Sequence, residues 1–190
     1  MTLLEQFLPQ FDVNEVHSIE IRATPERVYR ALQEYRLGDS AVTRFLFALR
    51  RLPALLTAKG RAALQAAQQQ EPPFIQMLDK GGFVKMAETP NKEIVVGLVG
   101  KFWKPVPEQV KVANGAAFLL FGDPAYAKAA MNFHLAPNGN GLTCLSTETR
   151  VCVPDSKSRR LFRLYWALIG FFSGWIRAEM LRGIKKAAEL

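Results

Sequence analysis

Reactive and metal-binding side chains are scarce in this chain of 190 residues, which contains two cysteines and two histidines. Cys144 and Cys152 are predicted to lie on one strand, where a rise of about 3.3 Å per residue separates them by roughly 26 Å, far beyond disulfide reach. Two thiols are too few for a structural zinc site, and neither His17 nor His134 has a metal-binding partner next to it in the sequence. We therefore expect reduced thiols, no metal, no cofactor and a cytoplasmic location.

Long hydrophobic runs are missing as well. The one membrane candidate, Leu164 to Ile176, holds 13 uncharged residues between Arg163 and Arg177, whereas a helix needs about 20 to cross a bilayer. The N-terminal segment Met1 to Gln10 carries Glu5 and lacks a basic start, which disfavours a secretory signal. Neither a membrane-spanning nor a secreted protein is expected.

The sequence contains no motif for catalysis or nucleotide binding. Gly97 and Gly100 lie within a predicted strand and lack the following helix and Lys-Ser/Thr pair of a phosphate-binding loop, so a bulge or bend in a curved sheet explains them better. No serine occurs in a Gly-x-Ser-x-Gly turn, and neither cysteine has an evident partner base. The residues alone favour a binding protein over an enzyme.

The chain is basic, with a formal net charge of +8 and a pI near 9.7. Its basic residues are scattered, with small clusters at Arg50-Arg51, Arg159-Arg160 and Lys185-Lys186, and no nucleic-acid-binding signature accompanies them. We expect a solvated surface rich in Lys and Arg and no nucleic acid partner, while weak contact with an anionic membrane stays open.

The N-terminal region reads as a strand followed by a helix. Residues Val16 to Arg22 alternate, with His17, Ile19 and Ile21 on one face, as in a half-buried strand. Thr24-Pro25-Glu26 then provides an N-cap hydroxyl, a proline at the first helical position and an acidic first turn. The predicted helix extends to Gly38 and buries a stripe of four residues at helical spacing: Val28, Ala31, Leu32 and Tyr35.

Helical pieces are predicted next, from Asp39 to the Pro72-Pro73 stop. From Phe74 the hydrophobic period changes to two, which indicates strands. These strands are expected near residues 74–79, 82–89, 92–103, 115–121, 125–136 and 141–153. Turns at Pro90-Asn91 and Asn138 to Gly141 join consecutive strands, so the sheet should be antiparallel.

The last segment, beginning at Asp155 or Ser156, is predicted to be one long amphipathic helix. Its densest apolar stripe includes Leu161, Leu164, Tyr165, Leu168, Phe171, Phe172 and Trp175, which we expect to face the sheet. Phe162 and Trp166 lie on a different side of the helix from this stripe, so we expect them to contact a second surface. The predicted fold class is α+β, with a curved antiparallel sheet packed on a long C-terminal helix and a helical insert after the first strand, in a single domain over residues 1–190.

Several segments resemble one known superfamily. They are residues 19–29 (IEIRATPERVY), 97–103 (GLVGKFW), 126–129 (YAKA) and 146–151 (STETRV), with Tyr165-Trp166 and Ser173 to Arg177 on the last helix. Together these resemble the START-like helix-grip proteins, also called the polyketide cyclase or Bet v 1-like (SRPBCC) superfamily, in a bacterial branch. The resemblance implies the helix-grip fold and an apolar pocket under the C-terminal helix.

We therefore expect the protein to bind or carry a small hydrophobic molecule, such as a lipid or polyketide-like compound, between sheet and helix. The residues expected to contact it are Leu98, Phe102, Met131, Phe133, Glu148, Arg150, Tyr165, Leu168 and Phe172. Glu148 and Arg150 are two apart on one strand and share a face, either as an exposed pair or inside the pocket, where Arg150 would bind a carboxylate or phosphate.

Two alternatives stay open at this point. The first is a cyclase or aromatase-type enzyme in which Glu148, Arg150 or Tyr165 supplies polar chemistry. The second is an interaction module that uses the apolar face around Phe162 and Trp166, with a basic rim, to contact a membrane surface, an acidic partner or a second copy in a homodimer.

Overall fold

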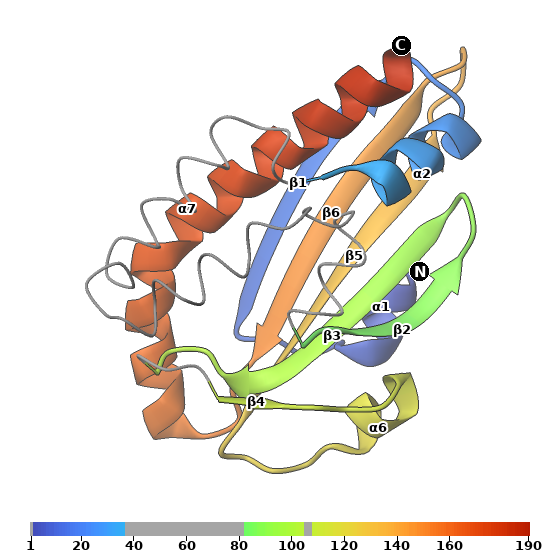
Figure 1. Ribbon diagram of the computed structural model, residues 1–190. Coiled ribbons are helices and arrows are strands. Elements are labelled where there is room, and N and C mark those ends of the chain that lie inside the picture. Colours follow the sequence, from blue (N-terminus) through green and yellow to red (C-terminus); the bar gives the residue numbers. More distant parts are fainter. Residues whose placement is uncertain (1, 37–81, 105–107) are drawn as a thin grey trace, which may run out of the picture.

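The computed structural model describes residues 2–36, 82–104 and 108–190, except the side chains of Leu168 and Ile169. It is an α+β protein with a six-stranded antiparallel sheet and a long C-terminal helix (Figure 1). The strands are β1 (Val13–Ile21), β2 (Val84–Thr89), β3 (Glu93–Lys101), β4 (Glu108–Val110), β5 (Ala127–Pro137) and β6 (Thr143–Cys152). The helices are α1 (Leu3–Phe7), α2 (Pro25–Glu34), α6 (Gly115–Leu120) and α7 (Ser156–Glu189).

The strand order is β1-β6-β5-β3-β2, with β4 paired to β3. Two hairpin turns set this register, and both were predicted from their turn residues. Asn91 between β2 and β3 has a φ of 61°, and Asn140 between β5 and β6 has a φ of 51°, beside two glycines that also have positive φ. Asparagine and glycine tolerate this left-handed backbone, so local residue choice determines where the strands reverse.

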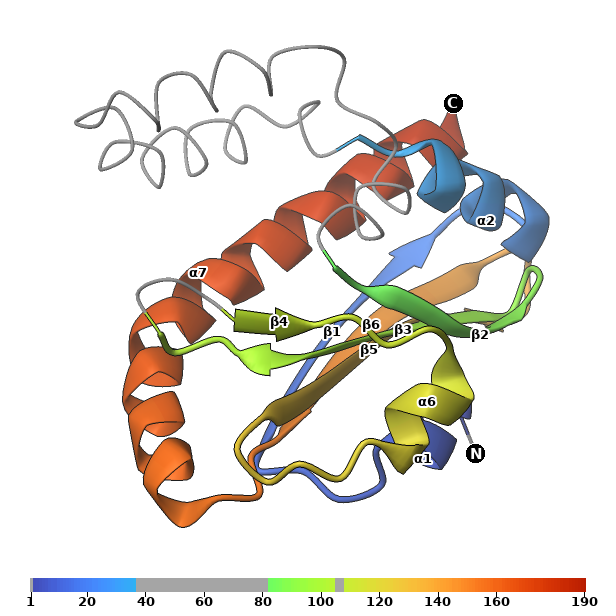
Figure 2. The same ribbon diagram turned by 60° about the horizontal axis from the view of Figure 1, so that its bottom comes forward.

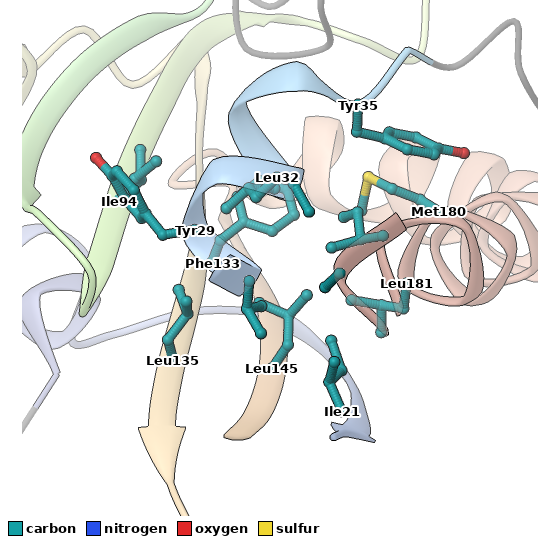
Figure 3. Close-up of a cluster of buried hydrophobic side chains, with 14 of the residues drawn as sticks. Ile21, Tyr29, Leu32, Tyr35, Ile94, Phe133, Leu135, Leu145, Met180 and Leu181 are labelled. Atoms are coloured by element: carbon teal, nitrogen blue, oxygen red, sulfur yellow. The ribbon is translucent and has the colours of Figure 1, made fainter. Parts of the chain in front are cut away.

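The upper part of the sheet packs against α2 and the C-terminal half of α7. The predicted stripe of α2 is buried there, and it meets Met180, Leu181 and Ile184 from α7. Figure 3 shows Leu32, Met180 and Leu181 gathered beside Phe133 and Leu145 of the sheet. We call this side of the sheet the inner face. Because strand side chains alternate, the inner face carries the odd-numbered residues of β1, β5 and β6.

The N-terminal half of α7 contacts a separate cluster at the other end of the inner face. Phe162 is fully buried there against Val151 and Val153, and Tyr165 and Trp166 pack beside it. The rings of Phe162 and Trp166 stack with their centroids 5.7 Å apart. α7 therefore touches the inner face through two apolar clusters, one near each of its ends.

The opposite side of the sheet, the outer face, is covered by α1 and α6, which lie side by side (Figure 2). Phe118 from α6 and Leu4 from α1 are fully buried against Val95 and Val99 of β3. The buried Glu93 carboxylate accepts hydrogen bonds from the backbone N–H of Leu3 at 2.8 Å and of Leu4 at 3.4 Å. This carboxylate satisfies donors at the N-terminus of α1, where negative charge is favoured.

Four predictions about the elements were wrong or incomplete. Residues 115–121 are not a strand: Asn114 accepts a hydrogen bond from the Ala117 N–H and starts helix α6. Neither the short strand β4 nor the helix α1 was predicted. The first helix ends at Glu34, earlier than predicted, because Tyr35 already has a non-helical backbone. Gly38 itself, the helical insert and the 74–79 strand lie outside the described residues.

The orientation of α7 was also predicted wrongly. Phe162 and Trp166 face the sheet, whereas Leu161, Leu164 and Phe171 are exposed. The reason lies in the C-terminal turns of the helix. Met180, Leu181, Ile184 and Ala188 are buried, and at 100° per residue they centre on the side of the helix opposite Leu168. A single helix keeps one phase, so these turns rotate the central aromatic stripe away from the sheet.

No helix among the described residues is long and apolar enough to cross a membrane.

Candidate functional site: a polar cluster on the inner face

Five polar residues gather between the two apolar clusters on the inner face, and we call them the inner polar cluster: Glu15, His17, Thr147, Thr149 and Arg177. Glu15 pairs with Thr149 across β1 and β6, and His17 pairs with Thr147. Directly opposed side chains of an antiparallel pair lie about 5 Å apart at their Cβ atoms. The sheet register therefore places these four side chains next to each other.

Arg177 reaches the cluster from α7. Its Nη1 lies 3.1 Å from Oε2 of Glu15, while Oε1 of Glu15 lies 2.8 Å from Nε2 of His17. Burial lowers the pKa of Arg177, and the negative charge of Glu15 acts in the opposite direction. One carboxylate thus contacts both a guanidinium and an imidazole in a protected position.

Gly174 allows α7 to pass this close to β1. A Cβ added at this position would lie 2.6 Å from Oε1 of Glu15 and 3.3 Å from Nε2 of His17. Any larger residue would have to displace the charged pair or lift the helix. The cost of a glycine inside a helix, about 1 kcal/mol, is thereby offset by the approach of the helix to the cluster.

The two threonines distinguish the cluster from ordinary core. Thr147 is fully buried and Thr149 is 7% exposed, yet the hydroxyl of neither has a hydrogen-bond partner in the described part of the chain. Thr143 lies on the same strand and the same face and is equally buried, but its hydroxyl donates to the Ala23 carbonyl at 2.7 Å. An unsatisfied buried hydroxyl costs about 1–3 kcal/mol, so two adjacent ones are unusual in a native structure.

Three of the predicted ligand-contacting residues lie beside this cluster. Met131 pairs with Thr149 and Phe133 with Thr147, and Leu98 belongs to the neighbouring row opposite Ala129. All three side chains are buried. The inner face therefore presents an apolar surface directly next to the unsatisfied hydroxyls.

The remaining residues that were predicted to contact the ligand come from the last helix and from the end of β3, and those whose side chains the structure describes do not lie beside the inner polar cluster. Phe102 and Tyr165 pack in the aromatic cluster at the N-terminal end of α7. Phe172 is 38% exposed, on the turned-away side of the helix. The side chain of Leu168 lies outside the described residues.

The prediction for Glu148 and Arg150 needs a correction. Both lie on the outer face, because even-numbered residues of β6 point away from α7. Arg150 Nε donates to Glu148 at 2.7 Å, and its Nη1 donates to the Leu8 carbonyl at 3.2 Å. The guanidinium also lies 4.9 Å from the centre of the Phe11 ring. The pair is neither exposed nor part of an inner site: the N-terminal segment covers it.

Sequence reasoning missed the inner polar cluster, although one signal was present. Glu15 has the same strand parity as Ile19 and Ile21, so a strand that starts at Val13 places a carboxylate on the apolar face. The predicted strand started at Val16 and left Glu15 out. His17 was correctly placed on the inner face, but the Arg177 that completes its cluster is far away in the sequence and required the tertiary structure.

The charges of the cluster restrict what it can bind. Arg177 and Glu15 neutralise each other, which leaves no uncompensated cation for an anionic group among the residues of the cluster. Hydrogen-bonding capacity remains on the two hydroxyls, each of which can donate one hydrogen bond and accept others. It also remains on Oε2 of Glu15 and Nη1 of Arg177, which are ion-paired but make no hydrogen bond with a described residue. This chemistry suits a neutral polar group such as a hydroxyl or carbonyl.

Two surface hollows lined by described residues lie elsewhere. One is a groove between α2 and the C-terminal end of α7, lined by Arg27, Glu34 and Arg182 among others, and the other lies around Lys101 and Trp103. Neither is lined by a threonine whose buried hydroxyl lacks a partner in the described part of the chain. Neither hollow includes a residue of the inner polar cluster.

No protein-family model matches the chain, and no curated protein matches it. Two solved structures are similar to it over nearly the whole length. A conserved protein from Geobacillus kaustophilus shows 12% identity and a TM-score of 0.37, covering 93% of this chain and 95% of its own. A protein from Thermus thermophilus shows 14% identity and a TM-score of 0.34, covering 93% and 97%. At these scores neither similarity carries an argument about family or function.

Proposed function

We propose that the protein binds a small hydrophobic molecule with one neutral hydrogen-bonding end, on the inner face between the sheet and α7. The observation that carries this proposal is the pair of buried hydroxyls of Thr147 and Thr149, which have no partner among the described residues. A ligand hydroxyl or carbonyl that bonds to them would remove the desolvation cost that they impose on the empty protein. The apolar part of the ligand would then lie against Met131 and Leu98.

The resemblance of the sequence to START-like helix-grip proteins points to the same place, because those proteins are expected to hold apolar ligands under the last helix. We include the helix-grip arrangement and membership of that superfamily in the proposal. The support from this structure is that α7 contacts the inner face through two separate apolar clusters, with the inner polar cluster between them. A ligand that lies between the two apolar clusters would be covered by the middle of α7.

The structure does not favour the enzyme alternative, because most of the residues that it needs are not on the inner face. It required Glu148, Arg150 or Tyr165 to converge on the ligand, but the first two lie on the outer face and Tyr165 packs among aromatic rings. The polar groups that do meet on the inner face are His17 and Glu15, and they are bonded to each other. We therefore propose that the inner face binds a ligand and does not catalyse a reaction on it.

Native mass spectrometry of gently purified protein tests this proposal directly. We expect adduct peaks of one or a few small molecules that are released by organic solvent. A second test compares naphthol with naphthalene, which share an apolar body and differ in one hydroxyl. Binding to the folded state raises the melting temperature, and naphthol should raise it more. Protein that is consistently empty, and indifferent to both compounds and to a wider lipid and aromatic library, would refute the proposal.

A further inference from the structure

α7 carries an apolar surface that the described part of the chain leaves exposed. Leu164 and Phe171 are 74% and 75% exposed, and Leu161, Phe172 and Trp175 are exposed as well. At 100° per residue these five residues fall within one sector of about 100°, and they extend about 20 Å along the helix. We call them the α7 stripe. A contiguous apolar surface rimmed by polar residues is typical of an interaction site.

The charges around the α7 stripe all have one sign on its N-terminal side. Every charged residue after Asp155 and before Glu179 is basic. Arg159 and Arg177 are bound to Asp12 and Glu15. The remaining three, Lys157, Arg160 and Arg163, are exposed and make no ion pair with a described residue.

Cations also follow the α7 stripe at its other end. Arg182 and Lys186 are exposed and lie on the same side of the helix, about two and three turns beyond Trp175. Arg182 is paired with Glu179, whereas Lys186 makes no ion pair with a described residue. Glu179 lies on this side as well, one turn beyond Trp175, and is neutralised by Arg182, so the unpaired charge at each end of the stripe is basic.

We propose that the α7 stripe docks on an anionic lipid bilayer, with α7 lying in the plane of the surface. A helix of this kind buries its apolar side chains at the boundary between headgroups and acyl chains, where aromatic rings are favoured. Each Lys or Arg near an anionic surface adds about 1 kcal/mol of attraction. Lys157, Arg160 and Lys186 would face the lipid phosphates on either side of the inserted stripe. This proposal does not depend on a ligand at the inner face.

A second copy of the chain fits the α7 stripe less well. A two-fold axis along the helices would place each basic end against the same end of the other copy, and an axis across them would set the helices antiparallel. Lys157 and Arg160 of one copy would then lie beside Arg182 and Lys186 of the other. Like charges directly opposed across an interface are unfavourable, whereas an anionic bilayer complements both basic ends.

Cosedimentation with vesicles tests the docking. We expect the protein to bind phosphatidylcholine vesicles containing about 30% phosphatidylserine at least about tenfold more tightly than pure phosphatidylcholine vesicles. Phe171→Glu places a charge in the centre of the α7 stripe and should weaken binding to the mixed vesicles at least about tenfold. Leu120→Glu is the matched control. Leu120 is 85% exposed on α6, away from the α7 stripe, and its replacement should leave binding unchanged.

A charge-reversal variant separates the electrostatic contribution. Lys157→Glu with Arg160→Glu should abolish the preference for phosphatidylserine. Because these side chains are exposed, the free energy of unfolding should stay close to that of the wild type. Equal binding of wild type and Phe171→Glu, or of the two vesicle types, would overturn the proposal. So would a wild-type dimer, detected by light scattering, that ignores vesicles and that Phe171→Glu dissociates into monomers.

Discussion

The two faces of the sheet each hold an arginine bound to a glutamate, but the surroundings of the two pairs differ. On the outer face, Arg150 bonds to Glu148 and to the Leu8 carbonyl. On the inner face, Arg177 lies 3.1 Å from Glu15 without hydrogen-bond geometry. The outer polar groups are paired with one another or with the backbone, whereas the inner ones lie beside two hydroxyls that no described residue satisfies.

We interpret this difference as one between a stabilising arrangement on the outer face and the site of the proposed ligand on the inner face. The outer groups extend into a network in which Asn132 donates to Glu93 at 2.8 Å and accepts from the Glu148 N–H at 2.9 Å. A buried network with its hydrogen bonds made rigidifies the fold, while a partly satisfied one lowers stability. Proteins retain such destabilising features where a ligand completes them. The substitutions below test this division, from the largest expected effect to the smallest.

Arg150→Met should cause the largest loss of stability. It removes the cation from Glu148 and leaves a largely buried carboxylate unpaired, which costs about 3 kcal/mol. Urea unfolding measures the change. The double variant Arg150→Met with Glu148→Leu should recover most of the loss, since replacing both members of a buried pair by apolar residues is often neutral. If the single variant is as stable as the wild type, the outer pair is not a stabilising element.

Glu93→Gln should reduce stability by about 2 kcal/mol, because the carboxylate that accepts from Leu3, Leu4 and Asn132 becomes a neutral amide. The loss should be concentrated at α1. Amide hydrogen exchange is therefore expected to speed up in residues 3–8 before it changes in β1 or β6. Uniform acceleration across the sheet would show that the carboxylate does not act through α1.

Thr143→Val and Thr147→Val should have opposite effects on stability, although the two residues share a strand, a face and full burial. Thr143 donates to the Ala23 carbonyl, so its replacement should cost about 1 kcal/mol. Thr147 has no partner within the described residues, so removal of its hydroxyl should add about 1 kcal/mol. Free energies of unfolding measure both. Equal losses would mean that the Thr147 hydroxyl is satisfied in solution.

Tyr29→Phe should have the smallest effect at neutral pH and a visible one in alkali. Burial and a hydrogen bond to Glu88 raise the pKa of the Tyr29 hydroxyl from 10.0 to about 12. The unfolded chain releases this proton first, so the stabilisation is complete below pH 10 and is lost as the pH rises toward 12. The wild type should therefore lose stability relative to the variant over this range, because the phenylalanine has no proton to release. A pH-independent difference would contradict the shift.

Local patterns in the sequence predicted most elements that depend on neighbouring residues. The alternation through Ile19 and Ile21 indicated a strand with its buried face, and Thr24-Pro25 indicated the start of α2. The hairpin turns followed from Pro90-Asn91 and from the asparagines and glycines of Asn138 to Gly141. The failure at residues 115–121 has a local cause, because an apolar stretch of that length fits a strand or a helix and the Asn114 side chain decides between them.

The candidate site was harder to predict because it depends on contacts between distant segments. The phase of α7 is set by Met180 and Ile184 near its C-terminus, so its central aromatic residues do not indicate which side meets the sheet. Likewise, the pairing of Glu15 with Arg177 joins the first strand to the last helix. The buried positions of Met131 and Phe133 on the inner face are what strand alternation predicts, because strand parity is a local property.

The most direct test of a ligand site on the inner face is the dissociation constant of naphthol for the variant Thr147→Val with Thr149→Val, measured against the wild type. Thr143→Val serves as the control. We predict that the constant rises about tenfold or more, the equivalent of about 1.4 kcal/mol, while the unliganded double variant is at least as stable as the wild type. An unchanged dissociation constant together with a loss of stability would show that the two hydroxyls belong to the core and not to a binding site.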